Sequence, residues 1–202
     1  MARIDPHTHR HLWGNQLHEQ FFIDNEADRN VHLAYVTLLK LDLAYELATF
    51  TPTWTGTFPI GIYTGTSDLD IICEAANLKV WLACVKASYG ACEKFQWEEG
   101  ISRSKPYASA SFLFEGLRIE LFGQKVPVQQ QYAFQHMMIE GKILAQASAL
   151  FKETILKLKQ EGVGTEPAFA QVLGLSGDPY EALLNIHSPD HIDQLLKSAG
   201  MK

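Results

Sequence analysis

The sequence predicts an α+β protein in which a small mixed β-sheet with flanking helices is followed by a C-terminal helical bundle. Three observations lead to this prediction. Apolar residues recur every three or four positions from Asn30 to Phe50, as on one face of an amphipathic helix. Short apolar runs punctuated by Gly and Pro follow as far as Phe122. From Tyr132 onward, Ala, Leu, Met, Gln and Lys recur at helical spacing with little strand signal.

The elements of the first half follow from local residue types. The helix over residues 30–50 ends at Pro52, because proline lacks the backbone donor that a helix needs. Trp54 begins a short strand that runs into Gly56-Thr57, and the Gly- and Pro-containing residues 58–66 form a loop. The apolar run over residues 69–73 is a strand buried on one or both faces.

A second helix is predicted over residues 78–89, followed by an edge strand over residues 91–97. Two further strands, over residues 108–115 and 117–122, flank Glu115-Gly116, which is a typical hairpin turn pair. These two strands are therefore expected to pair antiparallel.

The second half is predicted to be helical. Residues 132–158 form one long helix or a helix pair, which Gly162 and Gly164 close, and a short helix opens at Glu166-Pro167-Ala168. Asp178-Pro179 and Ser188-Pro189 each combine an N-cap residue with proline at the first helical position. Two short helices are therefore expected near the C-terminus.

We divide the chain into an N-terminal extension (residues 1–20), an α/β core (21–126) and a helical region packed on the core (127–202). The extension shows no sustained periodicity, and we expect it to be mobile. His7, His9 and His11 alternate within it, but polar residues separate them. We interpret them as part of an unstructured tail that binds metal only adventitiously.

Composition limits the partners. The chain has 202 residues, 47% of them hydrophobic, which suits one main domain with a proper core. A formal net charge of −6 gives no strong nucleic-acid signal. Three cysteines without a C-x-x-C pair support neither a disulfide framework nor a thiolate zinc site, so we expect a cytoplasmic setting. The sequence shows neither a membrane span nor a signal peptide, and it does not indicate an oligomeric state.

An acidic doublet opens the apolar strand. Side chains alternate along a strand, so Asp68 and Asp70 are expected on one face, with Leu69 and Ile71 turned to the core. Two carboxylates this close raise each other's pKa unless a cation compensates, and Mg²⁺ is the usual oxygen-bound cation. Alternatively, Ser67 and Asp68 bond nearby backbone amides and only cap a turn.

Two further features favour a metal and nucleotide site. Gly56 lets a phosphate approach the backbone, and the Thr57 hydroxyl can bind phosphate oxygens. Glu120 is expected on a neighbouring strand, on the face opposite Ile119 and Leu121, where it can complete the metal site or activate a nucleophile.

These parts resemble the nucleotidyltransferase superfamily typified by DNA polymerase beta and the aminoglycoside and tRNA nucleotidyltransferases. That family has an apolar residue, Gly, then Gly or Ser, a spacer of roughly ten residues, Asp-x-Asp between apolar residues, and a third acid on a later strand. The corresponding stretches here are Trp54-Thr55-Gly56-Thr57, residues 58–67, Ser67-Asp68-Leu69-Asp70-Ile71 and Ile119-Glu120-Leu121. The chain departs from the pattern in having Thr57, a spacer without Lys or Arg, and Glu as third acid.

From about Asn30 to Leu184, the chain also resembles a group of short bacterial proteins of unassigned function that carry this core and a helical C-terminal tail. The stretches that carry this resemblance are "GTFPIGI", "SDLDIICE", "IELFGQKVPV", "QHMMIEGKIL" and "TEPAFAQVLGLSGDPYEALL". Some members of that group carry a diadenosine tetraphosphate hydrolase label.

The superfamily resemblance implies a metal-dependent transfer of a nucleoside monophosphate from a nucleoside triphosphate to an unidentified hydroxyl acceptor. Two alternatives stay open, a catalytically silent nucleotide- or partner-binding module and a nucleotide phosphohydrolase. Mg²⁺ or Mn²⁺ is the implied cofactor. The residues that the resemblance assigns to the metal and to catalysis are Asp68, Asp70 and Glu120, and those assigned to nucleotide binding are Gly56, Thr57, Ser67, Arg118 and Lys142.

One of these residues has a simpler interpretation. Arg118 equally suits an ion pair with an acid of the sheet. Lys142 is a candidate for the γ-phosphate because it lies in the helical tail, which in this superfamily often closes over the nucleotide. His136, on the same predicted helix, is interpreted as a hydrogen-bonded packing residue.

Overall fold

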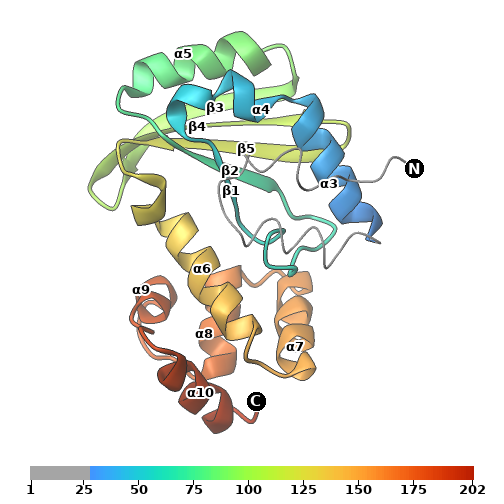
Figure 1. Ribbon diagram of the computed structural model, residues 1–202, viewed down its shortest axis with the longest axis vertical. Helices are drawn as coiled ribbons and strands as arrows, with labels where there is room; N and C mark the ends of the chain where they lie inside the picture. Colours follow the sequence, from blue (N-terminus) through green and yellow to red (C-terminus); the bar gives the residue numbers. More distant parts are fainter. Residues whose placement is uncertain (1–27) are drawn as a thin grey trace. The chain divides into compact units, whose positions relative to one another are not determined.

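The computed structural model describes residues 28–202 (Figure 1). The N-terminal extension with His7, His9 and His11 lies outside the described residues. The described residues form two compact units, one comprising residues 28–59 together with 68–131, and one comprising residues 60–67 together with 132–202. Residues 60–67 belong to the second unit because Ile62 is fully buried in its apolar core.

The first unit is built on a mixed five-stranded sheet, which confirms the predicted α+β class. Its strands are β1 (Thr53–Thr55), β2 (Leu69–Glu74), β3 (Glu93–Ser102), β4 (Lys105–Phe114) and β5 (Leu117–Gln124). Their spatial order is β1-β2-β5-β4-β3 (Figure 1). β2 and β5 run parallel, and the other three pairs are antiparallel. The parallel pair therefore lies inside the sheet.

Two hairpins join β3, β4 and β5. The predicted turn at Glu115-Gly116 is confirmed, with φ of 50° and 85°. The predicted edge strand over residues 91–97 is too short, because β3 continues to Ser102 and pairs with β4 through a second tight turn. That turn has φ of 48° at Arg103 and 65° at Ser104, a conformation that the residue types do not signal.

The helices of the first unit are α3 (Arg29–Lys40), α4 (Leu43–Glu46), the 3₁₀ turn η1 (Ala48–Phe50) and α5 (Leu78–Tyr89). The prediction of one helix over residues 30–50 is wrong. Asp42 adopts φ 48°, ψ 33°, and this left-handed residue ends one helix and starts the next. The apolar stripe is nevertheless buried as the periodicity indicated, at Val31, Ala34, Tyr35, Leu38, Leu43 and Leu47.

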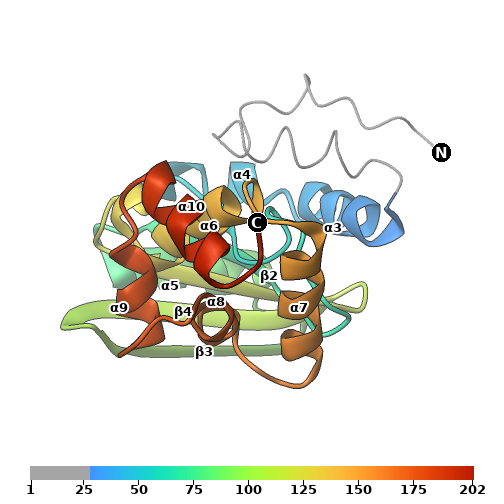
Figure 2. The ribbon, with the colours of Figure 1, turned by 90° about the horizontal axis from the view of Figure 1, so that it is seen from below.

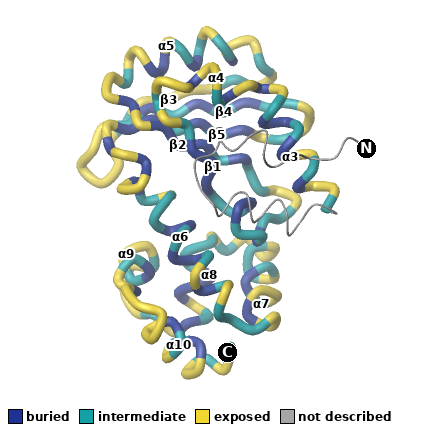
Figure 3. The backbone as a smooth tube through the Cα atoms, in the orientation of Figure 1, coloured by how far each residue is buried: buried dark blue, intermediate teal, exposed yellow. Residues whose placement is uncertain are grey.

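Helix α5 covers one face of the sheet (Figures 1 and 3). Tyr89 stacks on Phe112 with ring centroids 5.3 Å apart, and its hydroxyl donates to the Leu41 carbonyl at 3.1 Å, so the α3–α4 connection lies on this face as well. The residues of β2 and β5 that point to this face, Leu69, Ile71, Ile119 and Leu121, are fully buried. Consequently the alternate residues of these strands point to the opposite face.

Gly123 on β5 makes room for the Trp81 ring. A Cβ at this position would lie 2.7 Å from Cδ2 of Trp81, which is itself fully buried. We expect Gly123→Ala to lower the free energy of unfolding by about 1–3 kcal/mol, the cost of overpacking. Urea denaturation measures it, with Gly65→Ala as the control because nothing lies within 4 Å of a Cβ there. Equal stability of Gly123→Ala and wild type would contradict this assignment.

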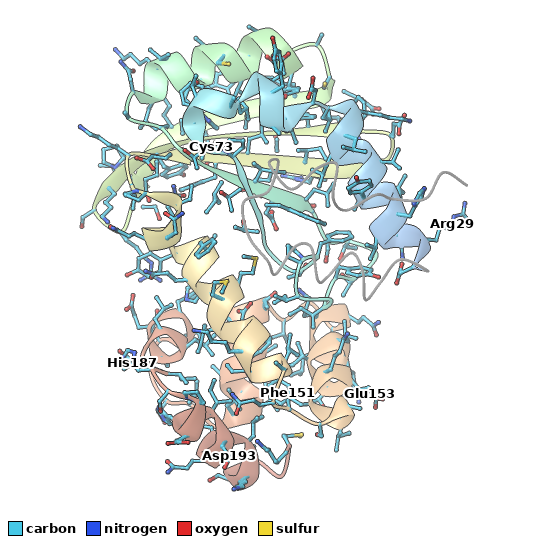
Figure 4. All side chains as sticks on the ribbon, viewed as in Figure 1. Arg29, Cys73, Phe151, Glu153, His187 and Asp193 are labelled. Atoms are coloured by element: carbon cyan, nitrogen blue, oxygen red, sulfur yellow. The ribbon has the colours of Figure 1, made fainter. Side chains whose placement is uncertain are left out.

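The second unit is a bundle of five helices. They are α6 (Tyr132–Leu144), α7 (Ala149–Gln160), α8 (Thr165–Leu173), α9 (Pro179–Leu184) and α10 (Pro189–Ser198). Helix α8 lies among α7, α9 and α10 (Figure 2). Phe151, labelled in Figure 4, packs edge-to-face on Phe169 at 5.4 Å in the core of the bundle. No helix among residues 28–202 has the length and hydrophobicity that a membrane crossing requires.

The predicted helix starts near the C-terminus are confirmed. Asp178 Oδ1 accepts from the backbone amides of Tyr180 and Glu181 at 2.9 and 3.0 Å. Ser188 Oγ accepts from the amide of His191 at 3.1 Å. In each case the N-cap side chain satisfies amides that have no partner inside the helix.

A polar cluster is buried among α6, α8 and α9. His136 Nε2 lies 2.9 Å from the carbonyl oxygen of Tyr180, and Nδ1 lies 3.6 Å from Glu166 Oε1, which confirms the packing interpretation of His136. Glu140, one turn further along α6, is only 4% exposed, and its Oε1 has no hydrogen-bond partner in the described part of the chain. Burial raises the pKa of Glu140 well above its ordinary value, the negative charge of Glu166 adds to the rise, and Lys159 opposes it.

We expect Glu140→Gln to stabilise the bundle at neutral pH. Because the pKa of Glu140 is higher in the folded than in the unfolded chain, its stabilising contribution is full below about pH 4.5 and is lost as the pH rises toward the folded-state pKa. Glutamine removes this penalty, so the free energy of unfolding should rise by about 1–2 kcal/mol at pH 7 and hardly change near pH 4. Chemical denaturation at both pH values measures this, with the exposed Glu153→Gln as control. A Glu140→Gln variant that is less stable than wild type at pH 7 would refute it.

Candidate active site

Strand pairing brings the predicted acids onto adjacent strands. Asp70 on β2 lies opposite Glu120 on the parallel strand β5 and opposite Thr55 on the antiparallel strand β1. Asp68 precedes β2 by one residue and lies in line with Arg118, because Leu69 pairs with Ile119. Asp68 thus lies just before the strand, which begins at Leu69 as predicted. Asp70 and Glu120 point to the sheet face opposite α5.

Gly56 touches the carboxylate of Asp70. It follows β1 directly and has φ +79°, which favours glycine. A Cβ on Gly56 would overlap Oδ2 of Asp70 and lie 3.0 Å from its Cγ. Only a residue without a side chain lets the backbone lie against this acid. Thr57 is the next residue, so its hydroxyl belongs to the same turn.

Arg118 forms an ion pair with Asp68. Its Nε lies 3.2 Å from Asp68 Oδ2, and its Nη2 lies 3.5 Å from Ser111 Oγ on β4. The Arg118 side chain is 55% exposed and that of Asp68 is 28% exposed, so this ion pair is open to water. The ion-pair interpretation of Arg118 is therefore confirmed, and the nucleotide contact assigned to it stays a prediction.

Arg118 only partly compensates the negative charge of Asp68 and Glu120. Burial raises the pKa of Glu120, the negative charges of Asp68 and Glu98 raise it further, and the Arg118 guanidinium lowers it only in part. Burial also raises the pKa of Asp68, and Arg118 again opposes the rise. A bound cation would favour the ionised form of both carboxylates.

Ser67 and Lys142 belong to the second unit and are not carried by the sheet. The Ser67 amide donates to the Thr64 carbonyl at 3.1 Å, and Ser67 Oγ accepts from the Thr64 amide at 2.9 Å. The Ser67 hydroxyl thus closes a turn, as the alternative interpretation of the doublet expected. Lys142 lies on α6 and is exposed. The nucleotide contacts assigned to Ser67 and Lys142 stay predictions.

The fit of the acids to a metal ion rests on their donor chemistry. No group of three or more His, Cys, Asp or Glu side chains among residues 28–202 is placed to hold a metal ion. Asp68 instead bonds to Arg118. Carboxylate oxygens are nonetheless the donors that Mg²⁺ prefers, and Asp70 lies against the backbone of Gly56. In their donor chemistry, Asp68, Asp70 and Glu120 fit a hard cation.

Sequence reasoning missed the contributions of β3 and β4 to this face. Ser111 pairs with Glu120 in the β4–β5 ladder and contacts Arg118. The Tyr107 hydroxyl donates to Glu98 Oε1 at 2.7 Å. The signal was present in the stretch ASASFLF, where Ser109 and Ser111 alternate with buried Ala108, Ala110 and Phe112. Such alternation marks a strand with one polar face.

Residues 36–186 match the family described as a domain of unknown function, DUF4269. A comparison with curated protein sequences finds no match. Among solved structures, a Cid1 structure described for its RNA terminal uridylyl transferase activity has a TM-score of 0.51 at 14% identity, over 72% of this chain and 48% of that one.

Two structures of the Cid1 poly(U) polymerase each have a TM-score of 0.50. The one bound to MgGTP is 16% identical and covers 72% of this chain and 49% of the Cid1 chain. The one bound to Mg 3′-dATP is 13% identical and covers 77% of this chain and 48% of the Cid1 chain. The chain thus spans about half the length of these proteins, and at such identities the likeness shows the fold alone. The family model matches well over half of the chain, so the chain belongs to the DUF4269 family, and its fold is nucleotidyltransferase-like.

Proposed function

We propose that the chain is a metal-dependent nucleotidyltransferase that moves a nucleoside monophosphate from a nucleoside triphosphate to a hydroxyl acceptor. The observation that carries the proposal is the position of Asp70, which has Glu120 beside it on β5 and the glycine backbone of Gly56 on its other side. The Cid1 structures with MgGTP and Mg 3′-dATP support a magnesium-bound triphosphate as substrate.

The chain's own residues supply binding and proton transfer. Asp68 and Asp70 would hold Mg²⁺ or Mn²⁺, which when bound neutralises phosphate charge. The backbone of Gly56 and the hydroxyl of Thr57 would bind phosphate oxygens. Glu120, whose pKa is raised by burial, would accept the proton of the acceptor hydroxyl at a carboxylate oxygen. The acceptor oxygen then bonds to the α-phosphorus as the bond to pyrophosphate breaks.

A catalytically silent nucleotide-binding module is the second candidate. The observation that favours it is the Asp68–Arg118 ion pair, together with the absence of a three-residue metal group among residues 28–202. A protein with this arrangement could bind a nucleotide without activating it. The two candidates differ in turnover and share the binding site.

The test is incubation of the full chain with α-labelled nucleoside triphosphates, Mg²⁺ and pools of small hydroxyl compounds, RNA and protein. A labelled acceptor together with pyrophosphate supports the transferase. Labelled monophosphate without a labelled acceptor shows a phosphohydrolase, and binding by calorimetry without turnover shows the silent module. Either of these two results overturns the transferase proposal.

A further inference from the structure

We propose that Arg118 is an exchangeable counter-ion, which neutralises Asp68 in the metal-free chain and moves to a phosphate group of the nucleotide when a divalent cation takes its place. This inference rests on the proposed function, and it assigns Arg118 a positioning role there. It is carried by the geometry of the ion pair, by the placement of the acids and by the exposure of the arginine.

The ion pair occupies one of the two carboxylate oxygens of Asp68. Arg118 Nε lies 3.2 Å from Oδ2 of Asp68, so a divalent cation that binds this oxygen competes with the guanidinium. Two positive charges at ångström separations repel each other strongly unless an anion lies between them. Metal binding at Asp68 and the present position of Arg118 therefore disfavour each other.

Arg118 is free to move. Its side chain is 55% exposed, and its second contact, from Nη2 to Ser111 Oγ, is at 3.5 Å and therefore weak. An exposed ion pair of this kind costs little to break. A guanidinium also binds phosphate oxygens well, because its fork of N–H donors matches them in geometry. The spacer over residues 58–67 contains no Lys or Arg, so Arg118 is well placed to supply this charge.

The exchange keeps the charge of the site balanced in both states. Without metal, the guanidinium offsets part of the negative charge of Asp68 and Glu120. With metal and nucleotide bound, the cation compensates the charge of the acids and the guanidinium binds the phosphates. Arg118 thus opposes binding of the metal alone and favours binding of metal and nucleotide together.

The test measures two affinities of the Arg118→Gln variant of the full chain. Mn²⁺ alone is titrated by the electron paramagnetic resonance of the free ion, and a non-hydrolysable ATP analogue is titrated by calorimetry in saturating Mn²⁺. We expect Mn²⁺ alone to bind about two- to fivefold more tightly, the range that an exposed ion pair allows. The nucleotide analogue should bind about tenfold more weakly, because a charge-assisted contact to phosphate is lost. The decisive result is that the affinity for Mn²⁺ rises while the affinity for the nucleotide analogue falls.

Lys79→Gln is the matched control, since it removes the same charge from α5, which covers the other face of the sheet. It should change neither affinity. If the wild type binds both ligands and Arg118→Gln shifts both affinities in one direction, or leaves either unchanged, the exchange is refuted and the proposed function stands. If the wild type binds neither ligand, the proposed function fails and the role of Arg118 fails with it.

Discussion

Replacing Asp70 by Asn is expected to reduce nucleotidyl transfer about a thousandfold, the scale on which loss of one charge-stabilising group slows an enzyme. Asparagine keeps the shape of the side chain and removes its charge. Asp70 lies between Gly56 and Glu120, so this charge acts where metal and phosphates are expected to meet. Pyrophosphate release under saturating nucleotide and Mg²⁺ measures the loss.

Glu99→Gln is the control for Asp70→Asn, because Glu99 pairs with buried Ala108 and so belongs to the other face of the sheet. This control should retain wild-type activity. Far-UV circular dichroism and thermal melting should show that Asp70→Asn folds. If its turnover matched that of the wild type, catalysis would have to lie elsewhere.

Substitution of Gly56 by Ala is expected to weaken nucleotide binding about a hundredfold and to lower the stability of the chain by about 1–3 kcal/mol. Two physical costs add up. A φ of +79° strains any residue with a Cβ, and the new methyl group would overlap Oδ2 of Asp70. The Asp70 carboxylate must therefore move, and the backbone no longer reaches phosphate oxygens. Calorimetry with a nucleotide analogue and urea denaturation measure the two effects.

A double-mutant cycle separates the two costs of Gly56→Ala. Asp70→Ala removes the carboxylate that the new methyl group would strike, so Gly56→Ala should destabilise the Asp70→Ala background less than the wild type. The remaining cost is the backbone strain alone. Stability changes that simply add would show that Gly56 and Asp70 are not in contact.

Much of the fold could be predicted from local pattern. The periodicity of residues 78–89 and the Glu115-Gly116 turn pair each gave the correct element, because backbone geometry repeats with a fixed period and few residues tolerate positive φ. The break at Asp42 escaped the same reasoning. Aspartate tolerates the left-handed conformation but does not require it, so the residue type alone does not reveal the break.

The sequence predicted which acids belong to the candidate site, but it did not predict which residues contact them. Alternation within each strand showed that Asp70 and Glu120 avoid the core. That Arg118 meets Asp68, and that Ser111 joins the same face from β4, depends on the register of strands far apart in sequence. Register is set by the summed burial of the whole sheet, so no short motif reveals it.

The sequence by itself determined most of the helices and strands, which faces are apolar, and that a pair of acids opens a buried strand after a glycine. Tertiary structure alone decided that β2 runs parallel beside β5, that the Gly56 backbone lies against Asp70, and that an arginine neutralises Asp68. The physical reason is the separation along the chain over which each kind of interaction acts. Backbone period and side-chain polarity act between near neighbours, whereas strand pairing and charge compensation join groups that only the packed chain brings within a few ångströms.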